Sequence, residues 1–188
     1  ARAIKEGKFS SRELLELLVE RESLINENLN AVVTLDLDRA RLAADAADEA
    51  LAAGRSYGPL HGIPVTIKDA LETKGLRSTG GATELSDYIP NRDAPVVDAI
   101  KRAGAIVFGK TNLPRWSGDI QSYNEIFGTT VNPWNSERVP GGSSGGAAAA
   151  VSAGLTSFEI GTDIGGSIRF PASFCGIYGH KPSFGIVP

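Results

Sequence analysis

Hydrophobic and polar positions alternate along the chain, and the first stretch has the spacing of an amphipathic helix. Leucine occupies four of the five positions 14–18, and Ser10 with Glu13 fits an N-terminal capping box. A β-prone run, AVVTL at 31–35, predicts a strand. The Ala-rich, charged run at 37–53 then predicts a second helix.

The same alternation continues toward the end of the chain. A β-branched run at 63–67 predicts a strand that delivers Lys68 at its far end. Two helix-to-strand units follow, the first with Asp93 as the expected N-cap; their elements are helix 95–103, strand 105–108, helix 147–153 and strand 157–160. Strands separated by helices predict an α/β fold with a mixed, mostly parallel central sheet flanked by helices.

Composition argues against several classes of protein. The 188 residues carry 19 Lys and Arg against 22 Asp and Glu, so a formal net charge of −3 offers no basic surface to nucleic-acid phosphates. One cysteine, Cys175, and two histidines, His61 and His180, are too few for a disulfide framework or a Cys/His metal site. No apolar run approaches the roughly 20 residues of a membrane helix. We therefore expect a cytoplasmic protein with no nucleic-acid partner, no membrane, no metal and no cofactor.

Glycine gathers in the last quarter of the chain, where eleven of the 22 glycines lie from Gly141 onward. The run GGSSGG at 141–146 precedes a predicted helix, whose positive end favours a ligand oxygen. The run GTDIGGSIR at 161–169 leaves a predicted strand, and the amides of 164–167 can converge on one anion beside Ser167, a candidate nucleophile. The alternatives are a flexible linker for the first run and a simple chain reversal for the second.

Residues 104–111, GAIVFGKT, match the phosphate-loop pattern G-x-x-x-x-G-K-[ST] letter for letter. A phosphate loop needs exposed amides in a turn, whereas Ala-Ile-Val-Phe is typical of a buried strand. Pro114 also interrupts the helix that should follow. A nucleotide-binding module is therefore the least favoured alternative.

A serine nucleophile needs a base, and three residues are candidates. His61 and His180 both lie in turn-rich segments, where a structural role is the more common one. Lys68 ends an apolar strand, where desolvation would lower its pKa and leave a neutral amine. The competing interpretation is a surface ion pair of Lys68 with Asp69 or Glu72.

Together, GIPVTIKD, GAIVFGKTNLP, NPWNSERVPGGSSGG and GTDIGGSIRFPASFCG resemble the amidase signature family of serine hydrolases. The resemblance covers the chain from about Leu60 to its end. It implies a Ser, cis-Ser, Lys triad that falls residue by residue on Ser167 as nucleophile, Ser143 as bridging serine and Lys68 as base. It also implies a cis peptide bond between Gly142 and Ser143.

The implied chemistry is attack by Ser167 on an amide carbonyl, with formation of an acyl-enzyme. The amides of Ile164, Gly165 and Gly166, together with that of Ser167, would form the oxyanion hole. Supporting roles in holding the catalytic loop fall on Ser144, Asp163 and Arg169.

The resemblance implies the family fold for the whole chain, as the N-terminal portion of a single, longer domain. Residues 1–59 correspond to a variable helical lead-in and residues 60–188 to the catalytic core. The leading hypothesis is an amidase that acts on a small-molecule amide. The alternative is the glutaminase (A) subunit of an aminoacyl-tRNA amidotransferase, and a homo-oligomer stays open.

Overall fold

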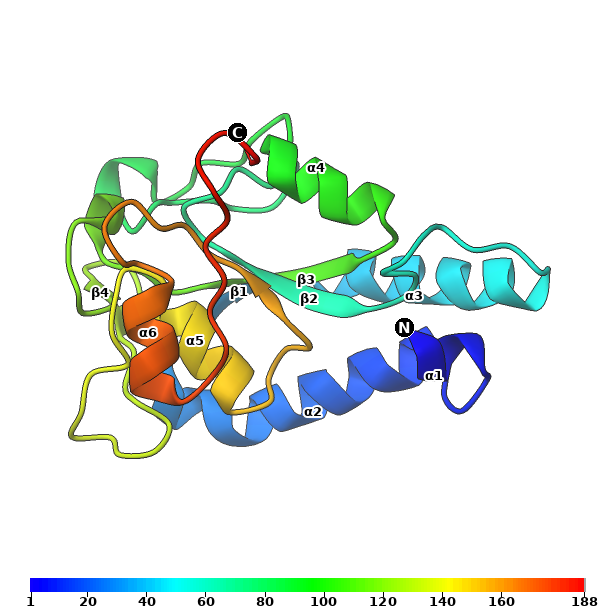
Figure 1. Cartoon of the computed structure of the whole chain (residues 1–188), viewed down its shortest axis with the longest axis horizontal. Coiled ribbons are helices and arrows are strands. Elements are labelled where there is room, and N and C mark those ends of the chain that lie inside the picture. The colour runs from blue at the N-terminus through cyan, green and yellow to red at the C-terminus, as the bar shows by residue number, and fades with distance from the viewer. Residues whose placement is uncertain (188) are drawn as a thin grey trace.

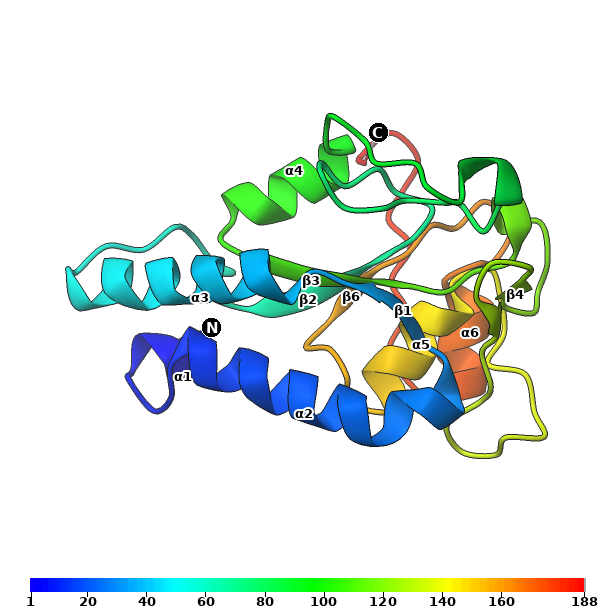
Figure 2. The same cartoon turned by 180° about the vertical axis from the view of Figure 1, so that it is seen from behind.

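The computed structural model describes residues 1–187 and has three layers, with a central sheet between helices. In Figures 1 and 2, helix α4 lies on one side of the sheet, and α2 and α5 lie on the other. The predicted α/β class is confirmed. The helices are α1 (Arg2–Lys5), α2 (Ser11–Leu29), α3 (Leu37–Ala52), α4 (Pro95–Arg102), α5 (Gly145–Ser152) and α6 (Arg169–Cys175), with short 3-10 turns η1 (Thr83–Leu85) and η2 (Arg115–Ser117).

The main sheet has the strand order β1-β3-β2-β6. Strand β2 pairs in parallel with both β3 and β6, while β1 runs antiparallel to β3, so the sheet is mixed and mostly parallel. A separate two-stranded ribbon joins β4 and β5. The strands are β1 (Val32–Leu35), β2 (Pro64–Lys68), β3 (Ile106–Thr111), β4 (Tyr123–Asn124), β5 (Gly128–Thr129) and β6 (Glu159–Ile160).

Local sequence signals explain where the first long helix and the central strand begin. The hydroxyl of Ser10 accepts from the Glu13 amide at 3.0 Å, and the Glu13 carboxylate accepts from the Ser10 amide at 2.7 Å, which is the predicted capping box. Pro64 is the first residue of β2, where its missing N–H costs the sheet nothing.

The prediction that Asp93 caps helix α4 is wrong. The N-cap is Ala94, and Pro95 begins the helix. The Asp93 carboxylate instead accepts from the Lys74 amide and from Lys101 Nζ, both at 2.7 Å. The Asp93 side chain, which the sequence predicted as a helix cap, therefore binds Lys74 and Lys101 instead.

One hydrophobic cluster of the core lies where α2 and α3 pack against β3. Leu15 of α2 packs with Phe108 of β3 and with a row of small residues in α3, Ala40, Ala44 and Ala47. The alanines recur at helical spacing, so they let α3 approach the sheet closely. Within residues 1–187, no helix is both long and apolar enough to cross a membrane.

The phosphate-loop interpretation of 104–111 fails in the structure. Strand β3 spans Ile106–Thr111, and its backbone pairs with β1 and β2 rather than facing a ligand. Lys110 is fully buried, and its Nζ donates to the Leu71 carbonyl at 2.6 Å and to Ser78 Oγ at 2.8 Å. A lysine held in this way is not available to a nucleotide phosphate.

Candidate active site

Lys68, the last residue of β2, is fully buried. Its Nζ donates to Ser143 Oγ at 2.6 Å and to Thr162 Oγ1 at 2.8 Å. Burial lowers the pKa of Lys68 to about 7, although the negative charges of Glu159 and Asp163 act in the opposite direction. The ion-pair alternative for Lys68 therefore does not hold, since its amine bonds to hydroxyls and not to the carboxylates of Asp69 or Glu72.

The run GGSSGG places Ser143 against Lys68. The peptide bond between Gly142 and Ser143 is cis, and Ser143 is buried. A side chain at Gly142 would meet the Asp119 carbonyl oxygen at 2.6 Å, so the loop 117–122 packs directly on this backbone. Glycine is therefore required here for close approach of two chain segments.

Ser144 joins the two glycine-rich runs. Its amide donates to the Ser167 carbonyl at 3.0 Å, and its Oγ donates to the Thr162 carbonyl at 3.2 Å. The side chain does not cap α5, although Ser144 is the N-cap residue of that helix. It binds both ends of the loop 162–167 to the segment that carries Ser143.

Asp163 organises the loop that follows β6. Its carboxylate accepts from the amides of Gly166 at 2.8 Å and Ile168 at 3.1 Å, and from the guanidinium of Arg169 at 2.9 and 3.0 Å. These bonds, with Arg169 as the largest cause, hold the pKa of Asp163 far below its usual range.

The Gly166 amide, one of the expected oxyanion-hole donors, is thus occupied by Asp163 in this structure. The amides of Ile164, Gly165 and Ser167 have no hydrogen-bond acceptor within residues 1–187. The Ile164 side chain is fully exposed, so this edge of the loop opens to solvent.

Ser167 is half-buried at the end of the loop. Its carbonyl is fixed by Ser144, but its hydroxyl makes no hydrogen bond within the described part of the chain. The structure therefore joins Lys68 to Ser143 and attaches the Ser167 backbone to the same unit. It does not form the hydroxyl-to-hydroxyl bond between Ser143 and Ser167.

The sequence did not predict two polar residues of this site, Thr162 and Glu159. Thr162 belongs to the GTDIGGSIR run without a motif signal of its own, yet its hydroxyl is the second partner of Lys68. Glu159 in β6 is a buried carboxyl whose pKa is raised to about 7 by desolvation. An acidic residue within a predicted strand was the available signal for Glu159.

The histidines play no part in this arrangement. The ring of His61 is buried between the Tyr57 amide at 3.0 Å and the Ala47 carbonyl at 3.0 Å, and His180 is exposed. Over residues 1–187, no group of three His, Cys, Asp or Glu side chains is arranged to hold a metal ion.

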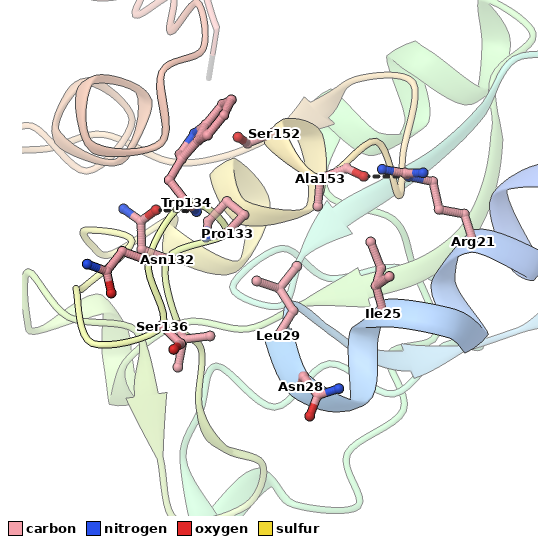
Figure 3. Close-up of a pocket in the computed structure, with 12 residues that line it drawn as sticks. Arg21, Ile25, Asn28, Leu29, Asn132, Pro133, Trp134, Ser136, Ser152 and Ala153 are labelled. Atoms are coloured by element: carbon pink, nitrogen blue, oxygen red, sulfur yellow. Dashed lines mark hydrogen bonds between the residues drawn. The ribbon is translucent and has the colours of Figure 1, made fainter.

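A cavity of about 490 Å³ lies elsewhere, between the second half of α2 and the loop 131–136. Figure 3 shows Ile25 and Leu29 of α2 on one side of this cavity and Pro133 on the other, with Arg21 Nε donating to the Ala153 carbonyl at 2.6 Å. None of the residues described above as the candidate active site lines this cavity.

A buried lysine, a serine on a cis peptide bond and a glycine-rich loop that ends in a second serine thus lie together in the structure. The amidase family model matches residues 13–188. The chain belongs to the amidase signature family, and the family prediction is confirmed.

Solved structures support the same assignment. An inhibitor-bound protein complex, described as vestigial and linked to the evolutionary origins of an s-triazine catabolic enzyme, superimposes with a TM-score of 0.94 at 34% identity, over 98% of this chain and 40% of that one. Native peptide amidase from Stenotrophomonas maltophilia gives a TM-score of 0.87 at 35% identity, over 93% of this chain and 37% of the other.

Among curated proteins, the chain is 47% identical over 184 residues to the A subunit of the glutamyl-tRNA(Gln) amidotransferase of Prochlorococcus marinus (strain MIT 9313). It is 46% identical over 185 residues to the protein of that name from Roseiflexus sp. (strain RS-1). Both alignments cover 98% of this chain, which spans 38% of each relative.

These relatives correct the expected partners. From the sequence we expected a small-molecule amide as the partner, and no nucleic acid because the net charge is slightly negative. That prediction is wrong, since the relatives are named as one subunit of an enzyme whose name includes a tRNA. Net charge reports only on electrostatic binding by this part of the chain and carries no information about assembly with other subunits.

Proposed function

We propose that the protein carrying this chain hydrolyses a carboxylic amide through an acyl-enzyme on Ser167, with Ser143 as relay and Lys68 as base. The observation that carries the proposal is the 2.6 Å contact between Lys68 Nζ and Ser143 Oγ at a fully buried lysine. An amine with a pKa of about 7 is substantially neutral at physiological pH and can accept a proton.

In the proposed reaction, neutral Lys68 accepts the proton of the Ser143 hydroxyl as Ser143 Oγ takes the proton of Ser167. Ser167 Oγ forms a bond to the acyl carbon, and the carbonyl oxygen becomes an oxyanion. When the C–N bond breaks, the proton returns through Ser143 to the leaving nitrogen, which departs as ammonia or an amine. Water then attacks the acyl-enzyme along the same proton path and releases the acid.

The free amides of Ile164, Gly165 and Ser167 are the donors that we assign to the oxyanion. The Gly166 amide joins them only if it leaves Asp163, because an N–H bonded at 2.8 Å to a carboxylate is already satisfied. The proton relay requires that the Ser167 hydroxyl rotate until it hydrogen-bonds to Ser143 Oγ. Catalytic hydrogen bonds of this kind often form or shorten only when substrate binds.

The test is covalent labelling with a fluorophosphonate probe, followed by peptide mapping. We expect the probe on Ser167 and no labelling of Ser167→Ala. The variant Ser173→Ala changes an exposed serine in α6 and should label as wild type does. Labelling at any other serine, or none at all, would refute the proposal.

The role of Lys68 has its own test. Lys68→Ala should slow acylation by about 10²–10⁴-fold, the usual contribution of a general base, with little change in reversible inhibitor binding. Lys5→Ala, which changes an exposed lysine in α1, is the matched control. An unchanged acylation rate in Lys68→Ala would remove the lysine from the mechanism.

A second candidate is the glutaminase role that the A component of an amidotransferase would have, and the identity of 44–47% to proteins of that name favours it. In that case Ser167 would release ammonia from glutamine for a partner subunit. Hydrolysis of glutamine that rises sharply when partner subunits and tRNA are added supports this role. Full activity on simple aliphatic or aryl amides by the isolated protein supports a stand-alone amidase instead.

Two further assignments stay predictions. One is the division into a helical lead-in over 1–59 and a catalytic core over 60–188, which limited proteolysis would test. The other is a cytoplasmic location, which cell fractionation would test.

A further inference from the structure

Glu159 is a half-buried acidic residue with a buried carboxyl oxygen, and the proposed mechanism does not use it. In the sheet, Glu159 of β6 lies opposite Thr66 of β2, and Thr111 of β3 lies opposite Lys68. Because strand side chains alternate between faces and register partners share a face, these four side chains lie on the same face of the sheet. Ser143, the partner of Lys68, lies two residues before the first residue of α5, which packs on the sheet on this side.

The side chain of Glu159 reaches across the central strand. Thr111 Oγ1 donates to Glu159 Oε1 at 2.5 Å, although β3 and β6 lie on opposite sides of β2. The carboxyl group therefore lies over β2, next to the Lys68 side chain. Its second oxygen, Oε2, is buried without a hydrogen-bond partner within residues 1–187.

Few charged side chains lie near the Glu159 carboxyl group. Lys110 and Lys68 are the cations that lower the pKa of Glu159, Lys110 more than Lys68. The Lys110 side chain lies on the other face, however, with its Nζ 3.7 Å from Asp69 Oδ1. Asp163, which also acts on Lys68, is bound to Arg169. Helix α5 contributes no titratable side chain.

Lys68 is thus the cation that shares the α5 face with Glu159. Burial disfavours the charged form of both groups, which brings the pKa of each to about 7. Two such groups titrate as a coupled pair where their charges interact by more than about one pKa unit.

We propose that Glu159 is a positioning residue for Lys68: its carboxylate holds Lys68 in the ammonium form and so sets the pH above which Lys68 accepts the proton of Ser143. This inference rests on the function proposed above. When the pair holds a single proton, two forms compete. One is the ammonium of Lys68 with the carboxylate of Glu159, and the other is the neutral amine with the neutral acid.

Only the forms with a neutral amine are active. Loss of the charge of Glu159 removes the competing ion-paired form, so Lys68 becomes neutral at a lower pH. A substitution that damaged the fold alone would lower the rate at every pH without moving the profile.

The experiment is the rate of fluorophosphonate labelling of Ser167 between pH 5 and 9. In Glu159→Gln, which keeps an acceptor for Thr111, the midpoint of the acidic limb should fall by about one pH unit, and labelling below the limb should be faster than in wild type. Glu49→Gln changes an exposed carboxylate of α3 and should leave the midpoint in place. Thr111→Val removes the donor that stabilises the carboxylate, so it should shift the midpoint in the same direction, but less.

The outcomes separate the two proposals. Absence of labelling at Ser167 in wild type refutes the proposed function. If wild type is labelled at Ser167 with a limb that depends on Lys68, but Glu159→Gln and Thr111→Val keep the wild-type midpoint, only the role of Glu159 is refuted.

A titration that needs no change at Glu159 covers the case in which Glu159→Gln does not fold. The ¹³C signal of the Glu159 carboxyl, followed by NMR, should titrate at a higher pH in Lys68→Ala than in wild type, because one of the two cations that lower its pKa is gone. An unchanged Glu159 titration in Lys68→Ala would overturn the inference.

Discussion

Lys68 and Asp69 are consecutive residues, yet their side chains lie on opposite faces of the sheet. Lys68 Nζ contacts Ser143 Oγ at 2.6 Å, while Asp69 Oδ1 lies 3.7 Å from Nζ of a different lysine, Lys110. Alternation along the backbone separates the two neighbours. The lysine of the candidate site is therefore not neutralised by the acid beside it in sequence. Asp69 instead binds the loop that follows β2, because its Oδ2 accepts from the amide and the hydroxyl of Thr79.

The buried Lys68 should leave a signature in the pH dependence of stability. Its pKa is about 7 when folded against an ordinary value of 10.5, so the unfolded chain binds more protons between these values, and stability rises with pH through this window. In Lys68→Met this rise should shrink by about 2 kcal/mol between pH 7 and 9. Urea unfolding at the two pH values measures it, with Lys5→Met as the exposed control; equal slopes for wild type and Lys68→Met would contradict it.

The buried pair of Asp69 and Lys110 should be costly to break. Both side chains are fully buried, and Lys110→Met would leave the carboxylate without its cation, which destabilises by about 3–5 kcal/mol. The double variant Asp69→Asn/Lys110→Met should cost less than the sum of the single changes. Chemical denaturation checks both, and Arg102→Ala, which breaks an exposed pair with Asp98, should cost under about 1 kcal/mol.

Loss of the Asp163 side chain should slow the labelling of Ser167 more than loss of the Arg169 side chain does. Asp163→Ala removes the acceptor for the Gly166 and Ile168 amides and should slow labelling of Ser167 by at least about tenfold, since the loop loses its fixed shape. Arg169→Ala removes a half-exposed guanidinium and leaves the amide bonds in place, so its effect should be smaller. The reverse order of the two labelling rates would show that the charge of Arg169, and not the amide bonds, shapes the loop.

Gly146 should be intolerant of a side chain. A Cβ there would lie 2.4 Å from the Asn112 nitrogen and 2.5 Å from its carbonyl oxygen, where α5 packs against the end of β3. Gly146→Ala should therefore destabilise by about 1–3 kcal/mol or more. Gly165→Ala is the matched control, because nothing lies within 4 Å of its Cβ position; thermal unfolding of the two variants gives the comparison.

Local signals in the sequence were sufficient for much of the architecture. The capping box of α2, the alanine row of α3 and the β-branched run of β2 each depend on residues close together in the chain. Asp93 shows the limit of this reasoning, because a side chain suited to a helix end was bound by Lys74 and Lys101 instead.

The sequence by itself determined the fold class, the family and the identity of the candidate residues Lys68, Ser143 and Ser167. Only the tertiary structure decided what surrounds them: that Lys68 takes Thr162 as its second partner, and that Glu159 shares its face of the sheet. The reason is that strand periodicity is a local property, whereas these contacts join residues more than 90 positions apart through the pairing of β2 with β6 and the loop beyond it. The register of that pairing is fixed by the packing of the whole sheet, and no short stretch of sequence carries it.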